Sequence, residues 1–158
     1  MKTLKIEEFD HNTFVPFGFS FGATDNGIRQ DHFDAISNLR AQARINLAQV
    51  RARRYEPTER ITVDTIERHR FSSQSFFPLN VSRYLILVGM PTEQGCPDVS
   101  ELKVLSVPGD VSITYKPGVW HMGISVLDGG NDFLMLVHEE GNAKDCDFAS
   151  MEPFNILR

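Results

Sequence analysis

Polar and apolar residues alternate over several short segments of the chain, which is the pattern of strands that bury one face. Two further segments are continuous apolar runs, typical of strands buried on both faces. The alternating segments are 44–53, 60–69 and 111–118, and the apolar runs are 83–90 and 132–139. Turn residues separate these segments. Many short strands joined by turns predict an all-β fold with little helix, in a single domain over residues 1–158.

The first third of the chain is less regular. Residues 14–22 alternate phenylalanine with smaller residues and end at a glycine, so we expect an irregular strand there. Over residues 31–40 we expect a short helix.

Composition narrows the class of protein. The chain has 158 residues, of which 41% are hydrophobic and 23% charged, as in ordinary globular proteins. A net charge of −5 argues against a nucleic-acid partner, because phosphate binding needs a basic surface. The start of the chain has no apolar signal core and no apolar run suits a membrane span, so we expect a cytoplasmic protein without a membrane partner. Cys96 and Cys146 have no metal-ligand spacing.

Arginines gather in the middle third of the chain. The simplest interpretation is a solvated sheet face with ion pairs to acidic residues elsewhere. The alternative is that one or two of them hold a substrate carboxylate by bidentate hydrogen bonds. The arginines concerned are Arg40, Arg44, Arg51, Arg53, Arg54, Arg60, Arg68 and Arg70.

The alternation over 60–69 directs Glu67 and His69 toward the interior. Ile61 and Val63 mark the core face of this strand, and residues an even number of positions away share that face. A carboxylate and an imidazole at the end of a core face must be paired, hydrogen-bonded or bound to a metal. Both are good ligands for a first-row divalent ion. The alternative is purely structural: Glu67 pairs with an arginine, and His69 is hydrogen-bonded at the mouth of a barrel.

A second stretch adds another histidine. His121 follows a Pro-Gly turn at 117–118 and adjoins Trp120, the only tryptophan. Taken alone, His121 is more simply a structural residue. Taken together, the stretches 67–77 and 115–123 lead us to expect that they meet inside a β-barrel and build one small-molecule site.

These two stretches resemble the paired motifs of cupins, β-barrels that hold a metal with three histidines and a glutamate. On this chain Glu67, His69, Gln74 and His121 fall on the four ligand positions, two of them changed in type. A particular branch fits better. The segments "ERHRFSSQSFFPL", "YKPGVWH" and "NDFLMLV", the early "FVPFG" and the late "DC" resemble the ureidoglycolate lyase family, once called ureidoglycolate hydrolase. The match spans most of the chain in order.

The resemblance implies a cupin-type double-stranded β-helix barrel that forms a homodimer. It implies a lyase that cleaves (S)-ureidoglycolate to glyoxylate and urea, in the catabolism of purine nitrogen through allantoin. It also implies a divalent metal, usually nickel, held by Glu67, His69, Gln74 and His121. In a metal-free site, His121 or His69 would act as the general base instead.

One departure from the family concerns the residues after His121. Many members have a second histidine and a proline there, whereas this chain has Met122 and Gly123. The departure bears on the substrate more than on the fold.

Four further residues complete the expected site. Tyr115 lies on the apolar face of its strand, so its hydroxyl either takes part in proton transfer and hydrogen bonding or is simply core. Lys116 would contact the substrate carboxylate if the turn after it redirects the side chain. Trp120 is expected to form a pocket wall, and Phe76 to line the barrel.

Two other functions stay open. The first is a non-catalytic cupin that binds a small carboxylate. The second is another metal-dependent cupin enzyme, an isomerase or a dioxygenase. The changed ligand types argue against the second, because dioxygenases favour histidine-rich iron sites.

Overall fold

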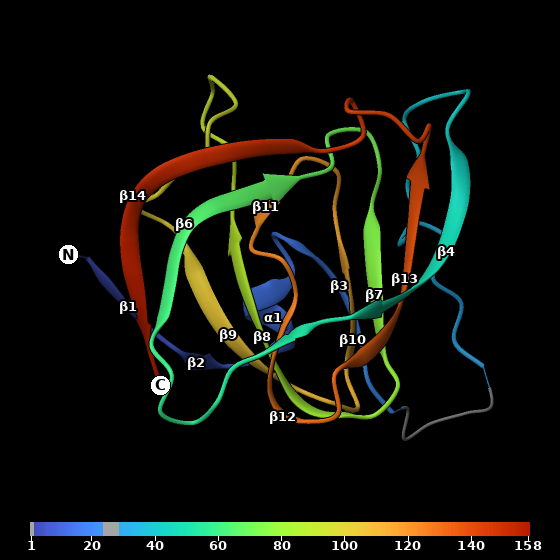
Figure 1. Ribbon diagram of the computed structural model, residues 1–158. Helices are drawn as coiled ribbons and strands as arrows, with labels where there is room; N and C mark the ends of the chain where they lie inside the picture. Colours follow the sequence, from blue (N-terminus) through green and yellow to red (C-terminus); the bar gives the residue numbers. More distant parts are fainter. Residues whose placement is uncertain (1, 24–28) are drawn as a thin grey trace.

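Strands dominate this computed structural model, which describes residues 2–23 and 29–158. They form two sheets that curve around a shared interior (Figure 1). The strands of the nine-stranded sheet are β1 (Thr3–Lys5), β2 (Glu7–Glu8), β5 (Arg53–Arg54), β6 (Ile61–Arg68), β8 (Val81–Gly89), β9 (Lys103–Pro108), β11 (Trp120–His121), β12 (Ser125–Gly129) and β14 (Asp147–Leu157). Those of the five-stranded sheet are β3 (Gly18–Phe21), β4 (Arg44–Arg51), β7 (Gln74–Pro78), β10 (Ser112–Tyr115) and β13 (Asp132–Glu139).

The larger sheet has the order β1-β14-β6-β11-β8-β12-β5, with β9 beside β8 and β2 beside β9. The smaller sheet has the order β3-β10-β7-β13-β4, so β3 and β4 are its edge strands. The prediction of an all-β, barrel-like cupin fold with little helix is confirmed. Within residues 2–23 and 29–158, no helix has the length and apolar character that crossing a membrane requires.

Helix is confined to one short turn near the start of the described chain. The helix α1 (His11–Phe14) begins after Asp10, whose side chain accepts a hydrogen bond from the backbone N–H of Thr13 at 2.9 Å. This is ordinary N-capping by an aspartate. The strand expected over 14–22 is present only as β3, because Phe14 still belongs to α1.

The helix expected over residues 31–40 is wrong. This segment instead runs beside the turn that follows β6, and its backbone finds partners there. The N–H of Leu39 donates to the carbonyl of Phe71 at 2.7 Å, and Asn38 forms a β-bridge with Ser72. Tertiary pairing thus replaces the local hydrogen bonds that a helix would need.

The two apolar runs behave differently. In β8, every residue from Tyr84 to Gly89 is buried, as expected for a strand covered on both faces. In β13, Phe133 and Val137 are fully buried, but Leu134 and Leu136 are only half-buried. The prediction for β13 is therefore wrong on one side, because the described residues cover the face of Leu134 and Leu136 only in part.

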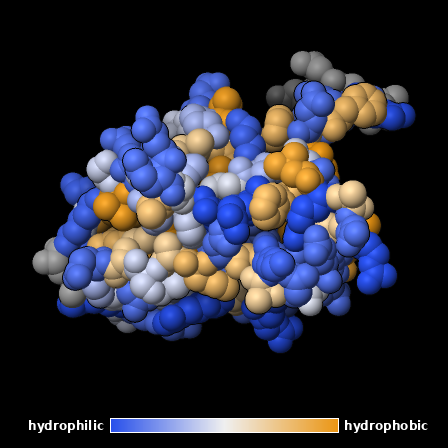
Figure 2. Space-filling model, turned by 90° about the horizontal axis from the view of Figure 1, so that it is seen from above, coloured by the Kyte–Doolittle hydropathy of each residue, from blue (hydrophilic) through white to orange (hydrophobic). Residues whose placement is uncertain are grey.

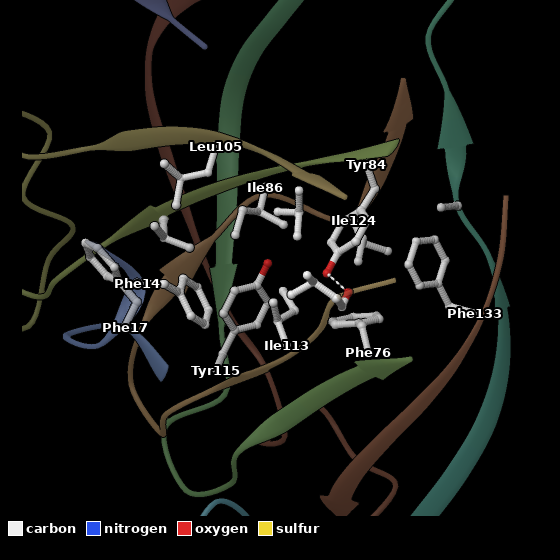
Figure 3. Close-up of a cluster of buried hydrophobic side chains, with 14 of the residues drawn as sticks. Phe14, Phe17, Phe76, Tyr84, Ile86, Leu105, Ile113, Tyr115, Ile124 and Phe133 are labelled. Carbon is white, nitrogen blue, oxygen red and sulfur yellow. Dashed lines mark hydrogen bonds between the residues drawn. The ribbon is translucent and has the colours of Figure 1, made fainter. Parts of the chain in front are cut away.

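The space between the sheets is filled by a cluster of aromatic and aliphatic side chains (Figure 3). Phe76 meets Tyr115 and Phe133 in edge-on contacts, with ring centroids 6.1 Å and 6.2 Å apart. The hydroxyl of Tyr84 donates to the carbonyl of Val111 at 2.7 Å, the dashed line in Figure 3. A second apolar cluster, which includes Ile61 and Val63 of β6, packs on Leu85 and Leu87 of β8.

Strict alternation fails in the middle of β6. Thr65 is exposed and Ile66 is buried in the same cluster as Ile61 and Val63, although an uninterrupted strand would place Ile66 on the other face. The pairing of β14 with β6 shifts register between Ser150 and Phe154 at this point. Bulges of this kind bend and twist a strand pair, and Figure 1 shows β6 and β14 curving together over one end of the barrel. Seen from that end, the surface is mostly hydrophilic, with apolar patches between the hydrophilic side chains (Figure 2).

β3 and β10 approach each other closely at Gly18, and a substitution there tests this contact. A Cβ atom at Gly18 would overlap the carbonyl oxygen of Thr114. We therefore expect Gly18→Ala to lower the free energy of unfolding by about 1–3 kcal/mol, as overpacking does. Urea denaturation followed by circular dichroism measures the change. The control is Gly22→Ala, whose Cβ would meet nothing closer than Val111 at 3.9 Å. Equal midpoints for the two variants would contradict the prediction.

Candidate active site

Three polar side chains converge where β6 ends. Glu67 in β6 and His121 in β11 are direct partners in the strand ladder. His69 follows two residues after Glu67, and its imidazole lies nearly parallel to that of His121, with ring centroids 6.1 Å apart. One donor atom from each of the three residues lies within 4.8 Å of the other two. The sequence-based expectation that the two stretches meet is therefore met by these three residues.

Hydrogen bonds fix how each imidazole is presented. Nδ1 of His69 contacts the carbonyl oxygen of Asp145 at 3.0 Å, and Nδ1 of His121 contacts that of Val119 at 3.0 Å. A carbonyl oxygen only accepts, so each Nδ1 must carry the proton. In the neutral ring this leaves the lone pair on Nε2. Both histidines thus offer Nε2 as a ligand or proton acceptor.

The protonation states of Glu67 and His69 also suit a role as ligands. Interaction with His121 lowers the pKa of Glu67, against burial, which alone would raise it. Burial is the main cause that lowers the pKa of His69, with the neighbouring His121 acting in the same direction. At neutral pH, Glu67 is therefore a carboxylate and His69 a neutral imidazole. These are the forms in which both residues bind metals.

The donor set fits a divalent cation. Two imidazole nitrogens and one carboxylate oxygen are ligands that first-row divalent ions accept. Nε2 of His121 is buried and has no hydrogen-bond partner among the described residues, and it lies 3.6 Å from Oε1 of Glu67. A buried nitrogen without a partner is costly unless something else binds it. The triad of Glu67, His69 and His121 is compatible with a metal on these grounds.

Two further buried polar atoms lie close to the triad in the fold. The ring of Tyr115 stacks on His121 with centroids 4.4 Å apart, and Tyr115 is the ladder partner of Gln74. Neither the Tyr115 hydroxyl nor Oε1 of Gln74 has a hydrogen-bond partner in the described part of the chain. The Gln74 amide nitrogen meets only the sulfur of Met135, at 3.3 Å. Burial raises the pKa of Tyr115 far above its ordinary value, so its hydroxyl stays neutral and can donate.

Two residues expected in the site lie elsewhere. Trp120 belongs to the second apolar cluster, where its indole packs under the guanidinium of Arg68 and its Nε1 donates to the carbonyl of Gly95. The half-buried Lys116 donates to the carbonyl of Val15 at 2.6 Å. Trp120 and His121 thus point to opposite sides of the sheet. Phe76 lies in the barrel core against Tyr115, as a lining residue would.

The clustered arginines are mostly engaged with acidic residues. Five of the eight form ion pairs: Arg40 with Asp145, Arg51 with Asp132, Arg53 with Glu59, and both Arg68 and Arg70 with Asp147. The ion pairs agree with the simpler interpretation of the cluster, but Arg40 and Arg68 are largely buried and do not belong to a solvated face.

Sequence reasoning missed two residues beside the site. Asp145 holds His69 through its carbonyl, and Sγ of Cys146 lies 3.6 Å from Oε2 of Glu67. Burial, together with the charge of Glu67, raises the pKa of the Cys146 thiol to about 12, so the thiol is protonated and can donate to that carboxylate. The Asp-Cys pair was visible in the sequence, but its contact with residues 67–69 was not.

The departure after His121 does not alter the triad. Met122 is buried in the second apolar cluster, and Gly123 is exposed. Neither residue takes the place of a ligand among Glu67, His69 and His121.

Comparison with known proteins gives one consistent family. The family model described as ureidoglycolate lyase matches residues 1–157. A putative ureidoglycolate lyase of Agrobacterium fabrum is 28% identical over 148 residues, covering 92% of this chain and 88% of that protein. The ureidoglycolate lyase of Azotobacter vinelandii is 28% identical over 155 residues, covering 93% and 91%. That of Burkholderia cepacia is 30% identical over 157 residues, covering 94% and 86%. This chain belongs to the ureidoglycolate lyase family.

Proposed function

We propose that this chain is an enzyme that splits (S)-ureidoglycolate into glyoxylate and urea, in the catabolism of purine nitrogen through allantoin. The observation that carries the proposal is the convergence of Glu67, His69 and His121, with both Nε2 lone pairs free of backbone partners. Membership of the ureidoglycolate lyase family and the printed names of the relatives support the substrate.

The reaction requires two proton movements. The carbon that is cleaved bears a hydroxyl, a carboxylate and the nitrogen of the ureido group. The hydroxyl loses its proton and becomes the carbonyl of glyoxylate as the C–N bond breaks. The electron pair of that bond leaves with the nitrogen, which takes up a proton to become urea. No water is consumed, so the reaction is that of a lyase.

Glu67, His69 and His121 would hold a divalent cation, with the unpartnered Oε1 of Gln74 as the fourth ligand. The chemistry that such a cation supplies when bound is that of a Lewis acid toward the substrate oxygens. The charge of the site supports this assignment. The Glu67 carboxylate alone would repel the carboxylate of the substrate at close range. We infer nickel as the ion from the family resemblance.

The protein's own groups perform the remaining tasks. The neutral hydroxyl of Tyr115 donates a hydrogen bond to the substrate, because burial keeps that proton in place. Stacking on Tyr115 holds the His121 ring, while the bond to Val119 selects the neutral tautomer whose lone pair is on Nε2. In a metal-free site the same Nε2 would accept the hydroxyl proton directly.

The first test is product formation. We expect the purified protein to release equal amounts of glyoxylate and urea from (S)-ureidoglycolate, to lose that activity on treatment with a chelator, and to regain it with nickel. Replacement of His121 by Asn should lower kcat/KM by at least about 100-fold. The Asn amide can still donate to the carbonyl of Val119, so the fold is kept while Nε2 is lost.

The controls separate the alternatives. His121→Gln restores a polar atom near the position of Nε2 and should be less impaired than His121→Asn. Saturable binding of ureidoglycolate without any product would favour the non-catalytic cupin instead. Full activity after removal of metal, confirmed by elemental analysis, would favour the metal-free mechanism.

Tyr115→Phe separates function from stability. The variant removes a buried hydroxyl that has no partner in the described part of the chain. An unsatisfied buried polar group costs about 1–3 kcal/mol, so the variant should be at least as stable as the parent in urea denaturation. If the hydroxyl serves the substrate, kcat should nevertheless fall by about 100-fold. A variant that is less stable but fully active would assign Tyr115 to the core alone.

We also propose that the chain forms a homodimer through the β4 edge of the smaller sheet. Ile45 and Leu47 of β4 are 61% and 63% exposed, and they share a face with the half-buried Leu134 and Leu136 of β13. An edge strand with apolar side chains readily pairs with another chain. A second copy of this chain, paired at β4, would bury these apolar side chains.

The dimer predicts that a charge on this face separates the copies. Leu47→Glu should reduce the mass measured by light scattering from twice the chain mass to that of a single chain. The matched control is Leu79→Glu, because Leu79 is 53% exposed in the turn between β7 and β8. A parent protein that is monomeric at micromolar concentration would rule out the dimer.

A further inference from the structure

We infer that Asp145, clamped by Arg40, is the positioning residue that sets the tautomer and the aim of His69. Asp145 touches neither Glu67 nor His121 through any hydrogen bond in the described structure; it acts through His69. The inference uses the proposed function only in taking Nε2 of His69 as the working atom of the site.

The carboxylate of Asp145 closes the turn in which this residue lies. Its carboxylate accepts hydrogen bonds from three successive backbone N–H groups, those of Glu140, Gly141 and Asn142, at 2.9, 2.7 and 2.9 Å. The N–H of Asp145 donates back to the carbonyl of Asn142 at 3.1 Å. The side chain therefore fixes the backbone of residues 140–145, including its own carbonyl.

The carbonyl of Asp145 connects this turn to the candidate site. The carbonyl oxygen of Asp145 receives the Nδ1 proton of His69 at 3.0 Å. Metal-binding and catalytic histidines commonly have their second ring nitrogen held in this way, and the holding group decides which nitrogen is left free. If residue 145 moved, His69 would lose the acceptor that selects the Nδ1–H tautomer.

The guanidinium of Arg40 holds Asp145 in place. Nη1 of Arg40 lies 2.7 Å from Oδ1 of Asp145, and Nη2 donates to the carbonyl of His138 at 3.0 Å. Both members of the pair are largely buried, with side chains 13% and 8% exposed. Removal of Arg40 would leave the buried Asp145 carboxylate without its cationic partner. Removal of the Asp145 charge would leave Arg40 with Glu140 alone, 3.6 Å away, so the clamp should be sensitive to substitution on either side.

The pair of Arg40 and Asp145 lies beside the turn between His69 and Gln74, two predicted site residues. Residues 37–40 run beside residues 71–73, with the N–H of Ser73 donating to the carbonyl of Ser37 at 3.0 Å. The hydroxyl of Ser72 accepts from the N–H of His138 at 2.8 Å. Arg40 and residues 138–145 therefore enclose the turn that joins His69 to Gln74. This packing would restrain the direction in which the His69 side chain points.

The test is the tautomer of His69, measured by nitrogen-15 chemical shifts of the imidazole rings in the metal-free, substrate-free protein. The parent should show a protonated Nδ1 and an unprotonated Nε2 at both His69 and His121. In Asp145→Asn we expect His69 alone to become a mixture of tautomers. His121 is the internal control, because its Nδ1 partner is Val119. Nickel affinity should fall about 10- to 100-fold in the same variant.

The matched control is Asp147→Asn. Asp147 is another carboxylate in an ion-paired network, with Arg68 and Arg70, two residues farther along the chain. Its side chain makes no hydrogen bond to His69 in the described structure. This variant should leave the His69 ring shifts unchanged, even if it loses comparable stability.

A second variant keeps the inference open to refutation if Asp145→Asn does not fold. Arg40→Lys retains a positive charge and leaves the three backbone bonds of Asp145 intact, but it cannot reach Asp145 and the His138 carbonyl together. It should shift the His69 tautomer in the same direction by a smaller amount. Folded variants at both positions with an unchanged His69 ring would overturn the inference. A shifted tautomer in a protein that never releases glyoxylate would instead refute the proposed reaction and leave the positioning role in place.

Discussion

The pairing of β6 with β11 is the contact on which the rest of the site depends. β11 contains only Trp120 and His121, yet it lies between β6 and β8 in the larger sheet. Through this short strand Glu67 faces His121 directly across the ladder. Burial of a carboxylate beside two imidazoles is unfavourable unless each group is hydrogen-bonded or ligated. The barrel meets part of that cost with backbone carbonyls on the two Nδ1 atoms, and it leaves the Nε2 side of the site open to a ligand.

Much of the site was predictable from short-range sequence patterns. The two-residue period identified β4, β6 and β10, and the apolar runs identified β8 and β13, whereas β9, β12 and β14 were not predicted. The Pro-Gly turn before His121 suggested that this histidine joins Glu67 and His69, and the three side chains do converge. The prediction that Glu67 shares a face with Ile61 and Val63 is wrong, because the alternation breaks at Thr65 and Ile66 and puts Ile66 on that face instead. Glu67 nevertheless meets His69 and His121 on the other side of the strand. The opposite directions of Trp120 and His121 also follow from alternation, so that pattern alone could have excluded Trp120 from the site.

The remaining features depend on contacts between distant parts of the chain. Asp145 lies 76 residues from His69, and Arg40 lies 105 residues from Asp145. No local pattern reports such contacts. The segment 31–40 has a composition that a helix would tolerate, but the backbone of residues 71–73 offers it hydrogen-bond partners. Likewise, the outer face of β13 looks buried in the sequence, since the pattern cannot show whether a second layer covers it.

The carbonyl of Gly95 has a consequence for how such a site can vary. It accepts hydrogen bonds from both Arg68 and Trp120, at 2.7 Å and 3.2 Å. These two residues are chain neighbours of Glu67 and His121 but point to the opposite side of the sheet. The connection between β8 and β9 thus grips the back of both ligand-bearing strands at one point. A change in that loop would therefore act on the spacing of Glu67 and His121 while both residues are retained, which gives evolution or an engineer a remote adjustment of the proposed site.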